Sequence, residues 1–347
     1  MQRETRPLLA ITMGDPAGIG PEVVLKALSH HHVYQRYRPL VIGDRRILER
    51  AAAWLDQPPS DYDLVDDPAH RRYEAGTISV LDLANADPEA CPPGRVSAAA
   101  GRAAVEYVFK ACDLALAQAV DAVVTAPLNK DAMHRAGFTY AGHTELLAER
   151  TGAERVSMLL IGPQLRIVHV STHVSLQEAI RRVTQARVEE VITLAHQSCV
   201  ALGIDAPRIA VAGLNPHASE DGLFGDEEQR EIMPAIGATR ARGLDVSNPQ
   251  PPDTIFLRAV KGEFDIVVAM YHDQGHIPMK LLAFDSGVNV SIGLPIVRTS
   301  VDHGTAFDIA GSGRASEQSL LAAMDIAVQM VYARHAEQAG GSRGTSV

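Results

Sequence analysis

Residues 8–28 read LLAITMGDPAGIGPEVVLKAL, and this stretch holds the unit from which the rest of the fold is built. The apolar run LLAITM predicts a strand, and the glycine-rich GDPAGIG predicts a tight turn. PEVVLKAL predicts a helix, with its proline in the first helical turn. The same succession of short apolar run, turn and longer amphipathic segment returns along the chain.

Further strands are predicted at 39–43, 122–126, 156–162, 165–171, 208–213, 265–271 and 288–293. Further helices are predicted at 97–119, 186–202, 227–243 and 316–338. This alternation is typical of an α/β protein with a mainly parallel sheet. The two adjacent strands 156–162 and 165–171 predict some antiparallel pairing, so the sheet is expected to be partly mixed. The polar, proline-rich region 55–95 is expected to form surface loops.

Composition narrows the classes of function. The chain has 347 residues, 46% of them hydrophobic, which suits roughly two domains at about 150 residues each. Lys and Arg number 32 against 42 Asp and Glu, a net charge of −10 that argues against a nucleic-acid partner. No run approaches the ~18 apolar residues of a membrane span, and no targeting signal is evident. With only three scattered cysteines, a cytoplasmic location is expected.

Three histidines each come shortly after a predicted strand. His173 ends IVHVSTH, His217 ends IAVAGLNPH and His272 ends DIVVAMYH. Because the carboxyl ends of parallel strands surround the ligand crevice of an open sheet, three neutral imidazoles there suit a divalent cation. The alternative is three unrelated loop histidines that only make hydrogen bonds.

Two other segments carry candidate binding residues. In GHTELLAERTG, His143 and Thr144 stand at a helix start that favours an anion, although Thr144 could be a simple N-cap. Lys280, Asn289 and Arg298 surround a predicted strand. Together they suit a substrate with phosphate, carboxylate and hydroxyl groups, and the alternative is ordinary surface cations.

GDPAGIGPE matches no nucleotide-binding motif of known mechanics. Its glycines fall at 14, 18 and 20, which fits neither a P-loop nor G-x-G-x-x-G. The chain also lacks the G-x-S-x-G turn of many serine hydrolases. The segment is therefore interpreted as a tight turn between a strand and a helix.

Five long blocks, in order along nearly the whole chain, resemble the 4-hydroxythreonine-4-phosphate dehydrogenase family, often called the PdxA family. They are ITMGDPAGIGPEVVLKAL, TAPLNKDAMHRAGFTYAGHTELLAERTG, AGLNPHASEDGLFGDEE, YHDQGHIPMK and GLPIVRTSVDHGTAFDIAG. The resemblance implies a two-lobed isocitrate/isopropylmalate-dehydrogenase-like fold and a homodimer, with the active site in the cleft between the lobes near the partner subunit. The first lobe is expected at 1–135 plus 300–347 and the second at 136–299.

The resemblance also assigns roles residue by residue. One divalent metal (Zn, Co, Mn, Ni or Mg) is implied at His173, His217 and His272. The implied substrate residues are His143, Thr144, Lys280, Asn289 and Arg298. HGTAFDIAG is similar to the loop that holds the adenosine end of NAD in isopropylmalate dehydrogenases. It implies cofactor binding by His303, Gly304, Thr305, Ala306 and Asp308.

Two details resemble the subgroup that acts on D-threonate or D-erythronate 4-phosphate: His276 in HDQGHIPMK, and the AFDIAG sequence. A relative that acts on an aromatic dihydrodiol shares NPHASE and DQGHIP, but it lacks the GHTE block and the arginine that are present here. The expected reaction is NAD- and metal-dependent oxidation and decarboxylation of a 4-phosphorylated four-carbon 3-hydroxy acid to dihydroxyacetone phosphate. Lys280 is the expected acid or base.

Three alternatives remain at this point. One is the 4-phosphohydroxy-L-threonine dehydrogenase of pyridoxal phosphate (vitamin B6) biosynthesis. The others are a metal-dependent hydrolase of a phosphorylated metabolite and a non-catalytic sensor of such a metabolite.

Overall fold

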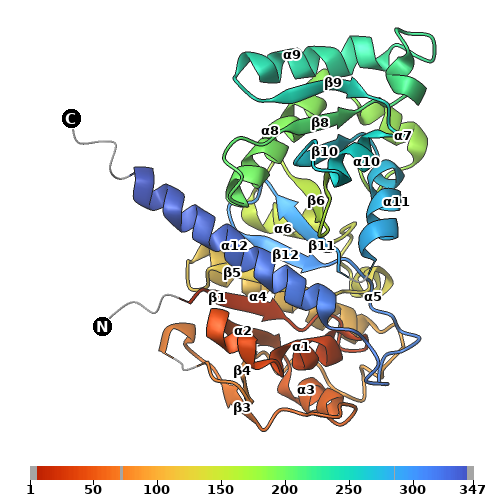
Figure 1. Cartoon of the computed structure of the whole chain (residues 1–347). Coiled ribbons are helices and arrows are strands. Elements are labelled where there is room, and N and C mark those ends of the chain that lie inside the picture. The colour runs from red at the N-terminus through yellow and green to blue at the C-terminus, as the bar shows by residue number, and fades with distance from the viewer. Residues whose placement is uncertain (1–5, 71–72, 285, 342–347) are drawn as a thin grey trace. The chain divides into compact units, whose positions relative to one another are not determined.

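The computed structural model describes residues 6–70, 73–284 and 286–341 (Figure 1). The chain divides into two compact units, residues 1–154 with 294–331 (unit 1) and 155–293 with 332–347 (unit 2). His143, Thr144 and Arg298 belong to unit 1, whereas the lobe boundaries expected from the sequence put them in the second lobe. The reason is local packing: Arg150 pairs with Asp113 of the neighbouring helix, and the strand of Arg298 pairs within the sheet of unit 1.

Unit 1 contains six strands that all pair in parallel, in the order β3-β4-β2-β1-β5-β12. The strands are β1 (Leu8–Thr12), β2 (Arg38–Gly43), β3 (Asp61–Leu64), β4 (Thr77–Asp82), β5 (Ala122–Thr125) and β12 (Arg298–Val301). The helical segments are α1 (Gly20–Leu28), α2 (His31–Arg36), α3 (Arg45–Ala52), η1 (Pro68–His70), α4 (Ala98–Leu116), α5 (Lys130–Arg135) and α6 (His143–Thr151). The last helix, α12 (Gln318–Gly341), belongs to unit 1 as far as Val331 and to unit 2 beyond it. The long helix α4 packs on β1, β2 and β5 and carries α5 and α6 beside it, whereas α1 packs on α3.

Unit 2 has a mixed sheet in the order β11-β6-β7-β10-β8-β9. Its strands are β6 (Ser157–Ile161), β7 (Arg166–His169), β8 (Ile209–Ala212), β9 (Val246–Gln250), β10 (Ile266–Ala269) and β11 (Val288–Ile292). Its helical segments are α7 (Leu176–Arg182), α8 (Gln185–Ala201), η2 (Pro216–Ser219), η3 (Glu228–Ile232), α9 (Met233–Ala241), α10 (Ile255–Val260) and α11 (His272–Ala283). β6 runs antiparallel to β7 and β11, and the other pairs are parallel, which confirms the prediction of a mainly parallel, partly mixed sheet.

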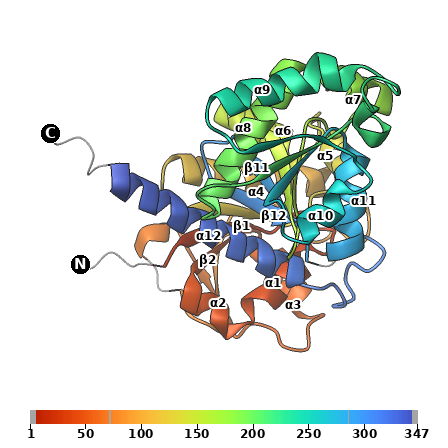
Figure 2. The same ribbon diagram turned by 45° about the horizontal axis from the view of Figure 1, so that its top comes forward.

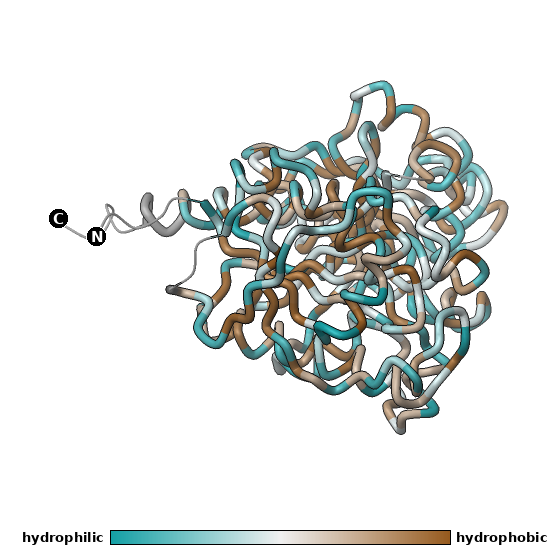
Figure 3. Tube along the Cα trace, turned by 90° about the horizontal axis from the view of Figure 1, so that it is seen from below, coloured by the Kyte–Doolittle hydropathy of each residue, from teal (hydrophilic) through white to brown (hydrophobic). Residues whose placement is uncertain are grey.

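Burial explains why the apolar runs become strands. All five residues of β1 and all four of β5 are buried, as expected for strands of a parallel sheet with helices packed on it. In unit 2, α8 packs on β6, β7, β8 and β10, and α9 packs on α8 and β9. α10 packs on β8 and β10, and α11 packs on β7 and β10 (Figure 2). Hydrophobic segments are concentrated in the interior of the trace, and many of the outer turns are hydrophilic (Figure 3).

The expectation that region 55–95 consists of surface loops was wrong in part. Thr77–Asp82 forms β4, whose four central residues are buried, and it pairs with β2 on one side and β3 on the other. Two further strands, β9 and β12, were not predicted from the sequence. Their sequences VSNPQ and RTSV are polar or interrupted by proline, so the partners in the sheet determine their conformation rather than their own propensity.

In the described part of the chain no helix is long and apolar enough to span a bilayer. The cysteines Cys91, Cys112 and Cys199 are all buried free thiols.

Candidate functional site

A buried arginine is the centre of one group of predicted substrate residues, all in unit 1. Arg298 opens β12 with only 1% of its surface exposed, and its Nη2 donates a hydrogen bond of 2.6 Å to Oγ1 of Thr125 at the end of β5. His143 opens α6 immediately after Gly142, and Glu145 lies in the first turn of that helix. β12 pairs in parallel with β5, with Arg298 opposite Val123, so the Arg298 side chain extends along the neighbouring strand to reach Thr125.

The electrostatics of this group favour an anionic ligand. Burial lowers the pKa of Arg298 to about 9, an effect partly offset by Glu145. The pKa of His143 is held well below its ordinary value by burial and by the positive charges of Arg298 and Lys130. Nε2 of His143 is buried and has no hydrogen-bond partner in the described residues. A phosphate or carboxylate bound here would be stabilised by the two positive charges and could hydrogen-bond to the neutral imidazole.

The predicted cofactor residues form a segment, 303–308, that follows β12 in unit 1. Thr305 is buried, whereas Gly304 and Asp308 are exposed. Ala306 has a φ of 41°, in the left-handed region that a residue with a Cβ rarely adopts. An exposed carboxylate and an open glycine suit the hydroxyl groups and the close approach of a nucleotide.

The glycine-rich turn after β1 contains a buried carboxyl group. Asp15 is fully buried, and its Oδ1 accepts a 2.8 Å hydrogen bond from the amide of Ala17, with a further backbone bond from Asn129. Oδ2 has no partner in the described residues. Burial raises the pKa of Asp15 to about 6, although the two backbone hydrogen bonds act in the opposite direction.

In unit 2, four histidines gather where β7 ends and α11 begins. The ring of His272 stacks on that of His276 at 3.6 Å between centroids, and it lies 5.7 Å from His173. His169, fully buried at the end of β7, lies 4.9 Å from His276. A Cβ on Gly275 would meet Nε2 of His169 at 2.4 Å, so α11 approaches β7 closely only because a glycine stands there.

The third predicted metal ligand, His217, lies in a backbone turn of unusual geometry. His217, Ala218, Ser219, Glu220 and Asp221 all have φ between 46° and 70°. Five consecutive left-handed residues cost roughly 1–2 kcal/mol each, so the surroundings must impose this turn.

Buried polar side chains hold the histidine-bearing loops. Oε1 of Glu228 accepts hydrogen bonds of 2.7 Å from the amides of Leu214 and Asn215, just before the turn. Gln274 links the loops of His272 and His217, because its Oε1 accepts from the amide of Met270 at 2.6 Å while its Nε2 donates to the carbonyl of Gly213 at 2.8 Å.

In the described part of the chain, the three predicted metal ligands do not lie together. His173 and His272 form a pair, whereas the ring of His217 contacts Phe224 at 6.1 Å. Across 6–70, 73–284 and 286–341, no group of three His, Cys, Asp or Glu side chains is arranged to hold a metal ion. The pair fits two positions of a metal site, and the full triad stays a prediction.

The two remaining predicted residues lie on the same unit as these histidines. Lys280 is on α11, two turns beyond His272, and its Nζ lies 5.5 Å from the ring centroid of Phe284. Asn289 is on β11, and its Nδ2 lies 3.0 Å from Sδ of Met158.

Sequence reasoning missed several residues around these sites. Lys130, His169 and Gln274 were not singled out, although His169 stands only four residues before His173 in IVHVSTH. A histidine inside an apolar strand is a visible signal, and its role depends on what packs on the strand.

The chain matches known proteins along nearly its whole length. The family model described as "Pyridoxal phosphate biosynthetic protein PdxA" matches residues 35–327. A D-threonate 4-phosphate dehydrogenase of Cupriavidus necator is 52% identical over 92% of this chain and 95% of its own. A 4-hydroxythreonine-4-phosphate dehydrogenase of Desulfosudis oleivorans is 50% identical over 93% of this chain and 96% of its own.

Among solved structures, the 4-hydroxythreonine-4-phosphate dehydrogenase of Klebsiella pneumoniae superposes with a TM-score of 0.85 at 46% identity. The match covers 94% of this chain and 99% of that one. Sequence blocks, sheet topology and these matches agree along nearly the whole length, and the chain therefore belongs to the PdxA family.

Proposed function

We propose that this protein is an NAD-dependent dehydrogenase that oxidises and decarboxylates a 4-phosphorylated four-carbon 3-hydroxy acid. The preferred substrate is D-threonate or D-erythronate 4-phosphate, and the product is dihydroxyacetone phosphate. The observation that carries the proposal is the buried Arg298 beside His143, because this environment is suited to a phosphorylated substrate. The Cupriavidus necator relative supports the same substrate class by its name.

The chain's own residues provide binding and proton transfer. Arg298 and His143, with Thr144, hold the phosphate, and Asn289 binds a substrate oxygen. The Nζ of Lys280 takes the proton of the C3 hydroxyl and returns one after CO₂ leaves. When bound, the nicotinamide supplies a hydride acceptor for C3, and a divalent cation supplies Lewis acidity to the C3 oxygen. A 3-keto acid loses CO₂ readily because its ketone accepts the electron pair of the broken bond.

The proposal includes one divalent cation, Zn, Co, Mn, Ni or Mg, held by His173, His217 and His272. The 5.7 Å separation of the His173 and His272 rings supports it, since two imidazoles at this spacing can share one ion with Zn–N bonds of ~2 Å. Metal analysis of the purified protein tests this part, and His173→Ala and His272→Ala should each lower the bound metal without unfolding the chain.

The proposal also includes a homodimer in the cytoplasm. On α11 and just beyond it, Ile277, Leu281 and Phe284 are 60%, 82% and 70% exposed, an apolar surface that a second copy would cover. Buried reduced cysteines suit a cytoplasmic protein. Light scattering of the wild type and of Leu281→Glu tests the dimer, which the added charge should weaken.

NADH formation with three substrates tests the proposed reaction. D-Threonate 4-phosphate, D-erythronate 4-phosphate and 4-phosphohydroxy-L-threonine are compared by kcat/KM, with dihydroxyacetone phosphate measured as the product. A preference for the amino substrate would favour the alternative function in pyridoxal phosphate biosynthesis, which the name of the Desulfosudis oleivorans relative supports. Release of inorganic phosphate without NADH would indicate a hydrolase instead.

A further inference from the structure

A buried glutamate of the GDPAGIGPE segment holds a distant loop of unit 1. Glu22 lies in the first turn of α1, and its surface exposure is 0%. Its Oε1 accepts a hydrogen bond of 2.5 Å from the amide of Gly311, and its Oε2 accepts one of 2.8 Å from the amide of Gly313. Both carboxylate oxygens are therefore used by backbone groups of the loop that follows β12.

Lys26, one helical turn further along α1, holds the carbonyl groups of the same loop. Its Nζ donates to the carbonyl oxygen of Gly313 at 3.0 Å and to that of Ala315 at 2.6 Å. Residues four apart lie on the same helix face, so Glu22 and Lys26 present an acceptor and a donor side by side. The loop fits closely, because a Cβ on Gly313 would meet the carbonyl oxygen of Trp54 at 2.1 Å.

The turn before α1 holds the other end of the loop. The amide of Ile19 donates to the carbonyl oxygen of Thr305 at 3.0 Å, and a Cβ on Gly18 would meet Cβ of Thr305 at 2.9 Å. Between the two attachments lie Ala306, with its left-handed backbone, and the exposed Asp308. The conformation of this stretch therefore depends on both anchors rather than on local propensity.

We propose that Glu22 is a positioning residue for the nicotinamide nucleotide, acting through residues 303–308. This inference rests on the proposed function, which assigns that segment to the cofactor. By fixing Gly311 and Gly313, the Glu22 carboxylate keeps the exposed groups of the segment ready to bind. The GDPAGIGPE segment thereby acquires a role that its glycine spacing alone did not indicate.

Glu22→Gln is the sharpest perturbation, because it conserves shape and changes the hydrogen-bonding capacity of one atom. The amide oxygen can still accept from one glycine, but the NH₂ group would face the other backbone N–H as a second donor. One end of the anchor is lost, and the cofactor segment gains freedom that binding must then remove.

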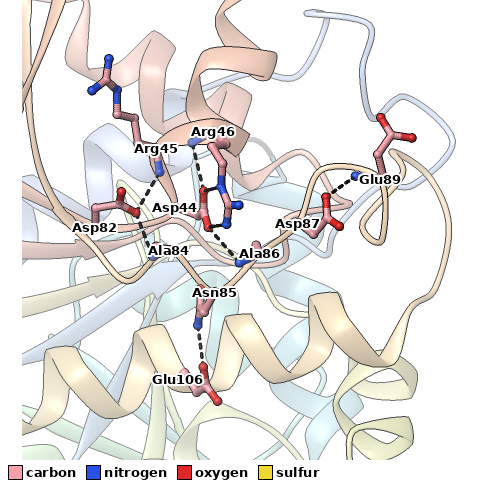
Figure 4. Close-up of polar contacts among 10 residues, drawn as sticks. All are labelled: Asp44, Arg45, Arg46, Asp82, Ala84, Asn85, Ala86, Asp87, Glu89 and Glu106. Atoms are coloured by element: carbon pink, nitrogen blue, oxygen red, sulfur yellow. Dashed lines mark hydrogen bonds and ion pairs between the residues drawn. The ribbon is translucent and has the colours of Figure 1, made fainter.

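Asp44→Asn provides a matched control in the same unit. Asp44 is also fully buried, and it accepts from the amides of Arg46 at 3.0 Å and Ala86 at 2.8 Å (Figure 4). Through the amide of Ala86 it anchors a different loop, and it also forms an ion pair with the half-exposed guanidinium of Arg46, whose Nε and Nη2 donate to it at 3.1 and 2.7 Å. Any general cost of weakening a buried carboxylate anchor appears in both variants.

Two measurements are made on wild type and both variants: hydrogen–deuterium exchange of peptides covering 303–315, and the NAD⁺ dissociation constant by calorimetry. In Glu22→Gln we expect faster exchange in 303–315, NAD⁺ binding weaker by about ten- to a hundredfold, and kcat at saturating NAD⁺ within about twofold of wild type. In Asp44→Asn we expect faster exchange near 84–89 and wild-type affinity for NAD⁺.

The outcomes separate the inference from the proposed function. If the wild type fails to bind NAD⁺, the proposed function is wrong. If the wild type binds and Glu22→Gln binds equally well, or Asp44→Asn loses as much affinity, the inference on Glu22 is overturned. If Glu22→Gln does not fold, Lys26→Met replaces it with the same expected pattern.

Discussion

The Asp15 carboxyl group should make the free energy of unfolding depend on pH. Replacing this residue by asparagine removes that contribution and so allows it to be measured. Asp15 is fully buried with Oδ2 unpartnered in the described residues, and burial raises its pKa from 3.8 to about 6. A difference of about two pKa units corresponds to roughly 3 kcal/mol between the protonated and charged forms. Asparagine has the shape of the protonated acid and carries no charge at any pH.

The sign follows from the direction of the shift. Because the pKa of the folded state lies above that of the unfolded state, the folded protein binds the proton more tightly. The stability that the folded protein has with Asp15 protonated is fully present below about pH 4 and is lost as the pH rises through about 6. Asp15→Asn should therefore gain stability relative to wild type as the pH rises from 4.5 to 8, by up to about 3 kcal/mol.

Thermal unfolding of both proteins across this pH range measures the difference. The cost of leaving an amide NH₂ without a partner lowers the stability of the variant equally at every pH, so only the change with pH reports on the Asp15 charge. A difference between the two proteins that stays constant from pH 4.5 to 8 would refute the reasoning.

Three further substitutions test other parts of the structure. Arg298→Lys keeps the charge but loses the planar fork and the bond to Thr125, so KM for the phosphorylated substrate should rise about tenfold; an unchanged KM with a large drop in Tm would show a purely structural arginine. Gly275→Ala should destabilise the chain by about 1–3 kcal/mol, because the new methyl group overlaps His169, and thermal unfolding measures this. Glu228→Ala should release the left-handed turn before it, seen as faster amide exchange in 214–222; unchanged exchange there would mean that other contacts hold the turn.

Part of the fold could be read from the sequence because it depends on local pattern. The runs LLAITM and AVVTA are apolar on both faces, so they became buried strands β1 and β5, as predicted. The short spacing between the strands now called β6 and β7 left room only for a tight connection, and the pairing is antiparallel. The family, too, was visible in the long sequence blocks, and the comparisons confirm it.

Other features were decided only by tertiary contacts. The polar RTSV of β12 is a strand because β5 pairs with it, and this pairing is also what buries Arg298 beside Thr125. The role of Gly275 was invisible in HDQGHIPMK, since it depends on the helix meeting His169, a residue more than a hundred positions earlier.

Glu22 shows the same limit most clearly. The sequence by itself determined that this residue opens a helix, because a proline and an acidic residue favour the first turn. Only the tertiary structure decided that its carboxylate accepts from Gly311 and Gly313, nearly three hundred residues away. Local pattern determines which segments become strands and helices. A long-range hydrogen bond joins two segments far apart in the chain, and the local sequence of neither segment indicates that the other is its partner.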